Sequence, residues 1–433
     1  MKILGAFMLP HPPLIVDEIG KEKIEDVKKT RDNYLKIAKE ISNLKPDTII
    51  ISSPHAPLYR DYFYLPNEEN AVGSFSKFGA KEVTFNQKYD IELIKEIENI
   101  SIEKQFPCGR VDSKELLDHG TMVPLYFVNK FYTGYKLVVI GLSGISLESN
   151  YEMGKIIKEA VNNLDRKVVY IASGDLSHKL QEYGPYGFDE NGPKYDEKII
   201  DVMSNARFEE LLNFDLDFLD KAAECGHRSF IMMSGFLDNV KVKPTFYSHE
   251  DITGVGYGIC SYYPIDFYIE LARKTINTYI KENKIIDIPE DTPKELLDNK
   301  AGVFVSIHKN DELRGCIGTI IPTTNCIAKE IINNAISAST KDPRFNPVTI
   351  DELNNLEINV DVLTAPEEIT DKSLLDPKKY GVIVTSGLKR GVLLPDLDGV
   401  DTVDEQISIS KRKAGISDNE KIKLERFEVV RHK

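Results

Sequence analysis

Short apolar runs alternate with polar helical stretches through the first half of the chain, and this alternation restricts the available folds more than any other feature. The runs ILGAFML at 3–9, TIIISS at 48–53, KLVVIGLS at 136–143 and KVVYIAS at 167–173 have the length and composition of buried strands. Polar stretches at about 18–43 and 149–163 predict helices. This alternation is typical of an α/β domain, so we expect a central sheet with helices on both faces.

A second domain is expected after residue 263. The chain has 433 residues, and single hydrophobic cores usually stop growing near ~250 to 300 residues. Pro264 follows the last apolar run, and the amphipathic segment FYIELARKTINTYIKENK then predicts the first helix of a new unit. Hairpin-like strand pairs such as VIVTSGLKRGVLLP follow. We therefore predict an α/β domain over residues 1–263 and a smaller α+β domain over residues 266–433.

Composition limits the kinds of partner. The 55 basic and 69 acidic residues give a net charge of -14, which argues against nucleic acid or an anionic membrane as the main partner and favours a small molecule or a protein. We find no export signal and no apolar stretch of the ~18 residues that a membrane span needs. The five cysteines form no CxxC pair, so we expect a reducing, cytoplasmic compartment.

Six of the eight histidines lie in the first domain, at positions 11, 55, 119, 178, 227 and 249. His11 follows the first predicted strand and His55 the second, and ligands collect beyond the carboxyl ends of strands in such sheets. Two neutral imidazoles at one sheet edge are good ligands for a first-row metal. The alternative is that each histidine caps a turn and faces solvent.

Two further histidines follow an aspartate closely. His178 stands in SGDLSH with Asp175 three residues before it, an arrangement that suits acid–base chemistry. His119 follows Asp118 in LLDHGTMVPL. For both segments the alternative is that the aspartate caps a helix and the histidine is incidental.

An anionic third metal ligand is available at Glu224 or Cys225. The segment KAAECGHRSFIMMSGFLDN predicts one helix whose start carries both residues. Two histidines and one carboxylate leave open positions on Fe(II) for a substrate oxygen and dioxygen, whereas a thiolate favours a softer ion such as Cu(I) or zinc. Glu224 could also do no more than complement a helix dipole, so the choice stays open here.

HPP near the start, SSPHAP, DHGTMVPL and SGDLSH, in this order, resemble the class III extradiol dioxygenase family of the LigB type and the related Memo family. The dioxygenase resemblance implies that His11, His55 and Glu224 bind ferrous iron, that His119 and His178 act in acid–base steps, and that the substrate is a catechol-like diol. In the Memo family the position that aligns with Cys225 is also a cysteine, so the Memo resemblance instead implies a role for the Cys225 thiol at the site.

The second domain resembles the AMMECR domain through LRGCIGTI, KDPRFNPV, INVDVLTAPEEI and KAGI. Within these motifs, Cys316 is either a reactive thiol or a packed core residue. Arg314, Asp342 and Arg344 either line an anion pocket or form structural salt bridges. Fusions of the two domains resemble members of the so-called AmmeMemoRadiSam set, which implies a radical SAM protein as a partner by association.

The leading functional expectation is therefore a non-haem Fe(II) extradiol dioxygenase-like oxidoreductase acting on a catechol-like diol. The alternative is a Memo-like iron- or copper-binding protein without ring cleavage that works with a partner. A zinc-dependent hydrolase is the third hypothesis, since the same ligands on zinc would activate water.

Overall fold

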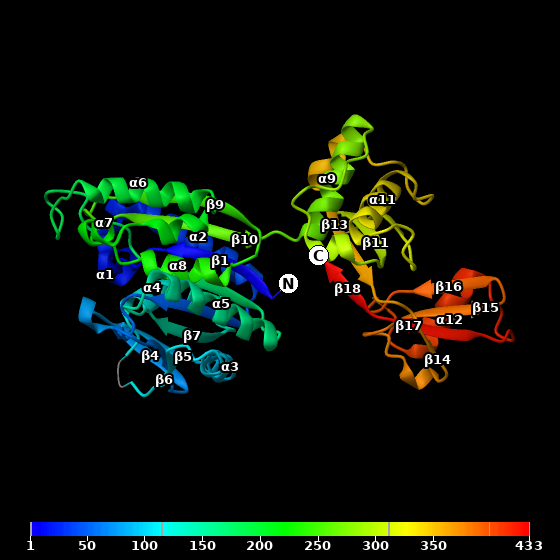
Figure 1. Ribbon diagram of the computed structural model, residues 1–433, viewed down its shortest axis with the longest axis horizontal. Helices are drawn as coiled ribbons and strands as arrows, with labels where there is room; N and C mark the ends of the chain where they lie inside the picture. The colour runs from blue at the N-terminus through cyan, green and yellow to red at the C-terminus, as the bar shows by residue number, and fades with distance from the viewer. Residues whose placement is uncertain (1, 114–115, 311, 398, 433) are drawn as a thin grey trace. The chain divides into compact units, whose positions relative to one another are not determined.

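The computed structural model describes residues 2–113, 116–310, 312–397 and 399–432. The chain divides into two compact units, Met1–Ile265 and Asp266–Lys433 (Figure 1). The first unit is α/β, with a central mixed sheet flanked by helices, and the second is a smaller α+β unit, so the predicted fold class is confirmed.

A six-stranded sheet of order β7-β2-β8-β1-β10-β9 forms the centre of the first unit. Four strands run parallel in it, namely β7 (Lys136–Gly141), β2 (Thr48–Ser53), β8 (Val168–Ser173) and β1 (Ile3–Leu9). The other two are antiparallel to their neighbours, namely β10 (Tyr257–Pro264) and β9 (Val242–Glu250). The carboxyl ends of the four parallel strands thus meet at one edge.

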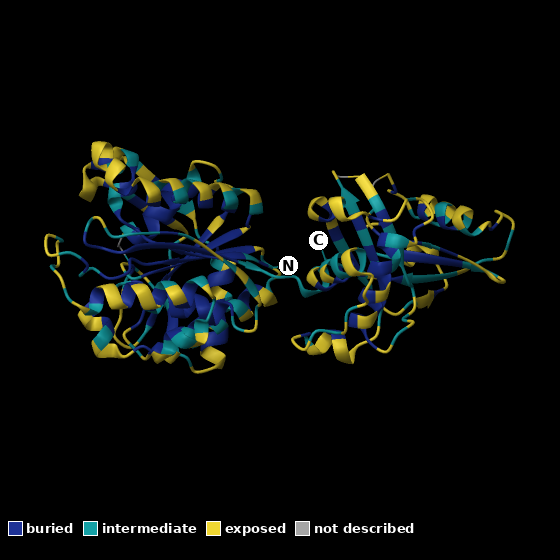
Figure 2. Cartoon of the chain, turned by 90° about the horizontal axis from the view of Figure 1, so that it is seen from above, coloured by how far each residue is buried: buried dark blue, intermediate teal, exposed yellow. Residues whose placement is uncertain are grey.

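The parallel strands are apolar because both of their faces are buried. Successive side chains of a strand point to opposite faces, and in β1 the side chains of Ala6 and Met8 join one core while those of Phe7 and Leu9 join the other. Figure 2 shows the strands as the buried layer, with exposed residues on the outer faces of the helices.

Two sets of helices cover this sheet. The core on one face contains residues of α2 (Lys28–Leu44) and α4 (His119–Asn129). The core on the other face contains residues of α3 (Ile91–Glu103), α5 (Leu147–Asn163), α6 (Asn191–Ser204), α7 (Leu216–Ala222) and α8 (His227–Phe236). Two small sheets complete the unit, β3 (Phe63–Pro66) with β6 (Cys108–Val111), and β4 (Asn70–Phe75) with β5 (Ala80–Lys88).

Two predicted helices are each broken in the structure. The stretch at 18–43 forms α1 (Asp17–Gly20), a 3-10 helix (Lys21–Val27) and only then α2, and α1 ends where Lys21 adopts a non-helical backbone conformation with a positive φ of 49°. The segment around Glu224 forms α7 (Leu216–Ala222) and α8 rather than one helix, because Ala223 is left-handed, with φ of 51°. Glu224 and Cys225 therefore lie in the connection between these helices.

The second unit contains two antiparallel sheets. The first has the order β12-β11-β13-β18 and packs against α9 (Phe267–Glu282), α10 (Lys294–Asp298) and α11 (Ile327–Thr340). Its strands are β12 (Glu312–Gly318), β11 (Gly302–Lys309), β13 (Glu357–Leu363) and β18 (Val429–His432). The second sheet has the order β14-β17-β15-β16 and packs against α12 (Val403–Ala414). Its strands are β14 (Glu367–Ile369), β17 (Lys423–Phe427), β15 (Gly381–Ser386) and β16 (Lys389–Leu393).

Among the residues that the structure describes, no helix combines the length and the apolar character required to cross a bilayer.

Candidate metal centre

His11 lies two residues beyond the end of β1 and exposes only 1% of its surface. Its backbone N–H donates a 2.8 Å hydrogen bond to Oδ1 of Asp175, and its ring Nδ1 lies 2.9 Å from Oγ of Ser173 at the end of β8. The Ser173 hydroxyl donates to the carbonyl oxygen of Gly120 over 2.6 Å, so it acts as an acceptor toward His11. The proton of neutral His11 therefore sits on Nδ1, which leaves Nε2 with a lone pair for a metal.

His55 and His119 come from the end of β2 and the start of α4. The Nε2 atoms of His55 and His11 lie 3.0 Å apart. The rings of His119 and His55 lie with their centroids 4.1 Å apart and their planes at 31°. Asp118 fixes this arrangement because it accepts a hydrogen bond from the first turn of α4, over 3.0 Å, and another from the Ser53 hydroxyl, over 2.6 Å. Three imidazoles thus meet where parallel strands end.

The thiol of Cys225 lies against these imidazoles. Its Sγ atom is 3.6 Å from Nε2 of His11, and the donor atoms of His11, His55 and Cys225 all lie within 4.8 Å of one another. The donor atoms of Asp175, His178 and Cys225 form a second group within the same limit. Cys225 belongs to both groups, so the two join into one cluster.

A close approach of two glycines brings the thiol to this position. A Cβ atom on Gly174 would lie 2.1 Å from Cα of Gly226, so the loop after β8 and the connection before α8 fit together only without side chains there. The N–H of Gly226 also donates to the carbonyl oxygen of Asp175 over 3.1 Å. Because Gly174 precedes Asp175 and Gly226 follows Cys225, this contact sets the carboxylate beside the thiol.

Glu224 has a different place. Its Oε2 atom accepts a 2.5 Å hydrogen bond from the backbone N–H of His227, the first residue of α8. This contact stabilises a helix N-terminus. Among the described residues, the groups of converging donor atoms at this edge include Cys225 and not Glu224. The structure therefore gathers the other predicted site residues and leaves Glu224 at the helix start.

Burial keeps the imidazoles of the cluster neutral. It lowers the pKa of His11 well below its ordinary value, and the neighbouring His55, His119 and His178 lower it further. Burial also lowers the pKa of His55 and of His178, and brings that of His119 to about 4. Neutral imidazole is the form that binds a metal ion.

The chemistry of the donors fits a first-row transition metal. Burial raises the pKa of the Cys225 thiol well above its ordinary value and that of Asp175 to about 7, and a bound cation would favour the ionised form of each. The Nδ1 atom of His178 is buried and has no hydrogen-bond partner among the described residues. A buried polar atom of this kind is normally satisfied by a partner, such as a ligand or a water molecule.

Comparison with known families agrees with this geometry. Residues 5–260 match the family described as the catalytic LigB subunit of aromatic ring-opening dioxygenase. The chain belongs to the LigB family. Residues 269–432 match the AMMECR1 family, so the predicted fusion of a LigB-type domain with an AMMECR domain is confirmed.

Relatives of this LigB-family chain include a protein of Clostridium acetobutylicum that is 40% identical over the full length of both chains. A protein of Thermotoga maritima is 51% identical over 38% of this chain and 97% of its own length. An uncharacterized protein of Pyrococcus horikoshii with a crystal structure is 34% identical, covers 38% of this chain and 88% of its own, and has a TM-score of 0.36. An uncharacterized protein of Escherichia coli K12 is 13% identical, covers 60% of this chain and 99% of its own, and has a TM-score of 0.41.

A cavity of about 470 Å³ opens beside the histidines of the LigB unit. His55 and His119 form part of its wall, and the remaining lining includes the apolar residues Phe78 and Met122 and the basic residue Lys77. The ring of Phe78 meets that of His119 edge-on, with centroids 5.5 Å apart. A small molecule in this cavity would therefore contact both imidazoles.

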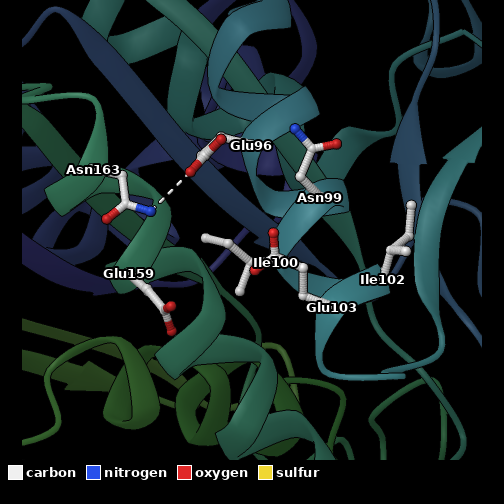
Figure 3. Close-up of a pocket in the computed structure, with 7 residues that line it drawn as sticks. All are labelled: Glu96, Asn99, Ile100, Ile102, Glu103, Glu159 and Asn163. Atoms are coloured by element: carbon white, nitrogen blue, oxygen red, sulfur yellow. Dashed lines mark hydrogen bonds between the residues drawn. The ribbon is translucent and has the colours of Figure 1, made fainter.

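A second hollow, of about 330 Å³, lies between α3 and α5 and has a different character (Figure 3). Glu96, Glu103 and Glu159 line it, and Asn163 donates a 2.8 Å hydrogen bond to Glu96. Because α5 ends at Asn163, shortly before β8 begins, this hollow lies toward the amino ends of the strands. The residues described as lining it include no imidazole or thiol.

In the AMMECR1 unit the arginines named from the sequence are paired. Arg314 holds the carboxylate of Glu352 with two nitrogens, at 3.1 and 2.9 Å, and Arg344 lies 2.7 Å from Asp342. The thiol of Cys316 accepts a hydrogen bond from the Ser306 hydroxyl over 3.2 Å. These contacts match the salt-bridge alternative for the arginines.

Sequence reasoning missed the serines that orient the cluster. Ser53 and Ser173 each occupy the last position of a buried strand, in TIIISS and KVVYIAS. A small hydroxyl at the carboxyl end of a buried strand faces the ligand edge of the sheet, and this position was the available signal.

Proposed function

We propose that the LigB unit is a metal-dependent oxidoreductase whose ion, iron or copper, is held by His11, His55 and Cys225. The convergence of their three donor atoms within 4.8 Å supports this proposal. A bound ion would supply redox chemistry and Lewis acidity. The thiolate supports a softer ion than the two-histidine, one-carboxylate set expected from the dioxygenase resemblance.

The surrounding side chains would orient the donors and move protons. Ser173 holds the ring proton of His11 on Nδ1, so Nε2 faces the cluster. Asp175 fixes the backbone of His11. His119 lines the cavity as a neutral imidazole, so in this proposal it accepts a proton from a substrate hydroxyl, and His178 is the second group able to do so. Binding in the cavity would exclude water from this step.

Ring cleavage of a catechol-like diol with Fe(II) is the second candidate. Membership of the LigB family and the part-apolar cavity at His55 and His119 favour it. The Oδ2 atom of Asp175 lies 3.8 Å from Nε2 of His11. The cluster therefore contains a carboxylate other than Glu224 that could complete a two-histidine, one-carboxylate ligand set. Without ring cleavage the role is Memo-like, and a radical SAM protein is then the partner that the resemblance implies.

The test is metal analysis of anaerobically purified protein and of three variants. We expect one ion per chain in the wild type, its loss in Cys225→Ala and its retention in Glu224→Gln, because only the thiol lies among the converging donors. Cys316→Ala, which removes a thiol of the AMMECR1 unit, is the matched control and should keep the ion.

Retention of the ion in Cys225→Ala together with its loss in Glu224→Gln would contradict the proposed ligand set. Oxygen consumption by the iron-loaded wild type in the presence of catechol separates the two candidates. Uptake of one dioxygen per catechol, with both oxygen atoms retained in a ring-opened product, would support ring cleavage, and the absence of such a product would support the Memo-like role.

A further inference from the structure

Two histidines of the first unit lie outside the metal cluster, and both contact α6. The hydroxyl of Tyr195 lies 3.3 Å from Nδ1 of His227, and Oδ2 of Asp196 lies 2.6 Å from Nε2 of His249. Tyr195 and Asp196 are consecutive residues of α6, and only 0% and 3% of their surfaces are exposed. A helix that contributes no donor to the cluster thus holds each of these two histidines through a buried polar side chain.

Both carboxylate oxygens of Asp196 are in use. Oδ2 pairs with His249, and Oδ1 accepts a 2.9 Å hydrogen bond from the backbone N–H of Ser177. Removing a carboxylate from water is costly unless hydrogen-bond partners replace the solvent, and His249 and Ser177 supply these partners to Asp196. A Cβ atom on Gly256 would lie 2.1 Å from Oδ2, which shows how closely the start of β10 approaches the carboxylate.

Ser177 is the residue through which Asp196 reaches the metal cluster. It lies between Asp175 and His178, two residues of the second donor group. Its carbonyl oxygen accepts from the N–H of Gly256 over 2.8 Å, and its hydroxyl donates to the carbonyl of Ala222 over 2.8 Å. Asp196 is the described acceptor for its remaining N–H. Loss of that acceptor would leave a buried donor unsatisfied, and the loop would shift to satisfy it.

A shift of this loop would reach several donors of the cluster at once. Asp175 accepts from the backbone of His11 over 2.8 Å, and its own N–H donates to Sγ of Cys225 over 3.3 Å. Movement at Ser177 therefore changes the spacing of an imidazole, a carboxylate and a thiol together.

We propose that Asp196, paired with His249, is a positioning residue for the metal centre, because it holds Ser177 and so fixes Asp175 and His178 relative to Cys225. Asp196 does not touch the metal site itself. The inference rests on the proposed metal-binding function and adds a residue on which the affinity and geometry of that site depend.

The first readout is binding of Co(II) to the full-length, metal-free protein, measured by competition with a chromophoric chelator and by the thiolate-to-metal absorption band. Loss of a contact that orients metal ligands typically weakens binding about 10- to 100-fold, and we expect this for Asp196→Ala with an altered band. Asp196→Asn keeps an acceptor for Ser177 and should retain most of the affinity. Asp201→Asn changes an exposed carboxylate of the same helix and should match the wild type.

The second readout does not need a metal. In metal-free protein labelled with 15N-histidine, the ring signals of His11 and His178 should move in Asp196→Ala and stay in place in Asp201→Asn. A folded Asp196→Ala with wild-type Co(II) affinity and unmoved ring signals would overturn the proposal. If the wild type binds no Co(II), the proposed function fails, and the ring signals alone decide the role of Asp196.

If Asp196→Ala does not fold, its partner residue His249 provides a second test of the proposal. His249 is partly exposed, with 26% of its side chain accessible, so His249→Ala should fold. We expect weaker Co(II) binding and the same movement of ring signals in this variant. Unchanged affinity and unchanged signals in His249→Ala would overturn the pairing.

Discussion

Replacing Gly174 by Ala should disconnect the Cys225 thiol from the histidines. The new Cβ would lie 2.1 Å from Cα of Gly226, and ordinary contact begins at 3.4 Å, so the two backbones must separate by about 1.3 Å. Gly226 carries its neighbour Cys225 with it, and a displacement of this size along the line between Sγ and His11 Nε2 would lengthen their separation from 3.6 Å to ~4.9 Å. Ligands at ~2.0 to 2.3 Å from one ion span at most ~4.4 Å, so both atoms could no longer bind it.

This backbone clash also has a cost in stability. Overpacking of a well-packed region costs about 1 to 3 kcal/mol, and about 1 kcal/mol corresponds to a melting-temperature change of ~2 to 4 °C in a unit of this size. We therefore expect calorimetry to show a fall of about 4 to 8 °C for ~2 kcal/mol, together with loss of the thiolate absorption band of Co(II).

The matched control for this substitution is Gly134→Ala. The atoms nearest to its Cβ would all belong to the Tyr132 side chain, the first at 3.0 Å, and a partly exposed side chain can move aside. A Gly174→Ala protein with the melting temperature and the Co(II) band of Gly134→Ala would refute the argument that these two loops are held at contact distance.

Two further predictions concern the histidines and the second unit. The double variant His11→Ala/His55→Ala should lose stoichiometric metal binding, measured by metal analysis, while its circular dichroism stays that of a folded protein. An unchanged metal content would contradict the assignment of these two histidines as ligands. In the AMMECR1 unit, hydrogen bonding from Arg314 lowers the pKa of Glu352 from 4.5 to about 2, so the carboxylate stabilises the fold above pH 4.5 and loses that contribution as the pH falls toward 2. Urea unfolding should show Glu352→Gln to be less stable than the wild type at pH 7 and equally stable near pH 2; equal stability at pH 7 would contradict this pairing.

The parallel strands could be predicted from the sequence because both of their faces are buried and their residues are therefore mostly apolar. The runs at 3–9 and 48–53 coincide with β1 and β2, and His11 and His55 follow them to the same edge, as expected. Strand ends constrain side-chain positions because the backbone hydrogen bonds of the sheet fix their spacing. These two histidines therefore followed from local pattern alone.

Helix breaks and close backbone contacts did not follow from local pattern. Lys21 and Ala223 both have a positive φ, and their residue types do not predict it, since such positions usually favour glycine or asparagine. The pairing of Asp196 with Ser177 joins residues that lie 19 positions apart, and the contact of Gly174 with Gly226 joins segments that are farther apart still. Contacts of this kind depend on the tertiary fold.

The choice between Glu224 and Cys225 shows how a single backbone turn selects the chemistry of the site. A continuous helix through this segment would have offered either side chain to the cluster. Ala223 instead caps the end of α7 and Gly226 precedes the first residue of α8, so four residues, 223–226, connect the helices. The carboxylate of Glu224 then meets the N–H of His227, where a negative charge complements the helix N-terminus, and the thiol of Cys225 meets His11. Carboxylates prefer hard ions and thiolates soft ones, so under the proposed function, in which Cys225 is a ligand, this connection would favour a softer metal.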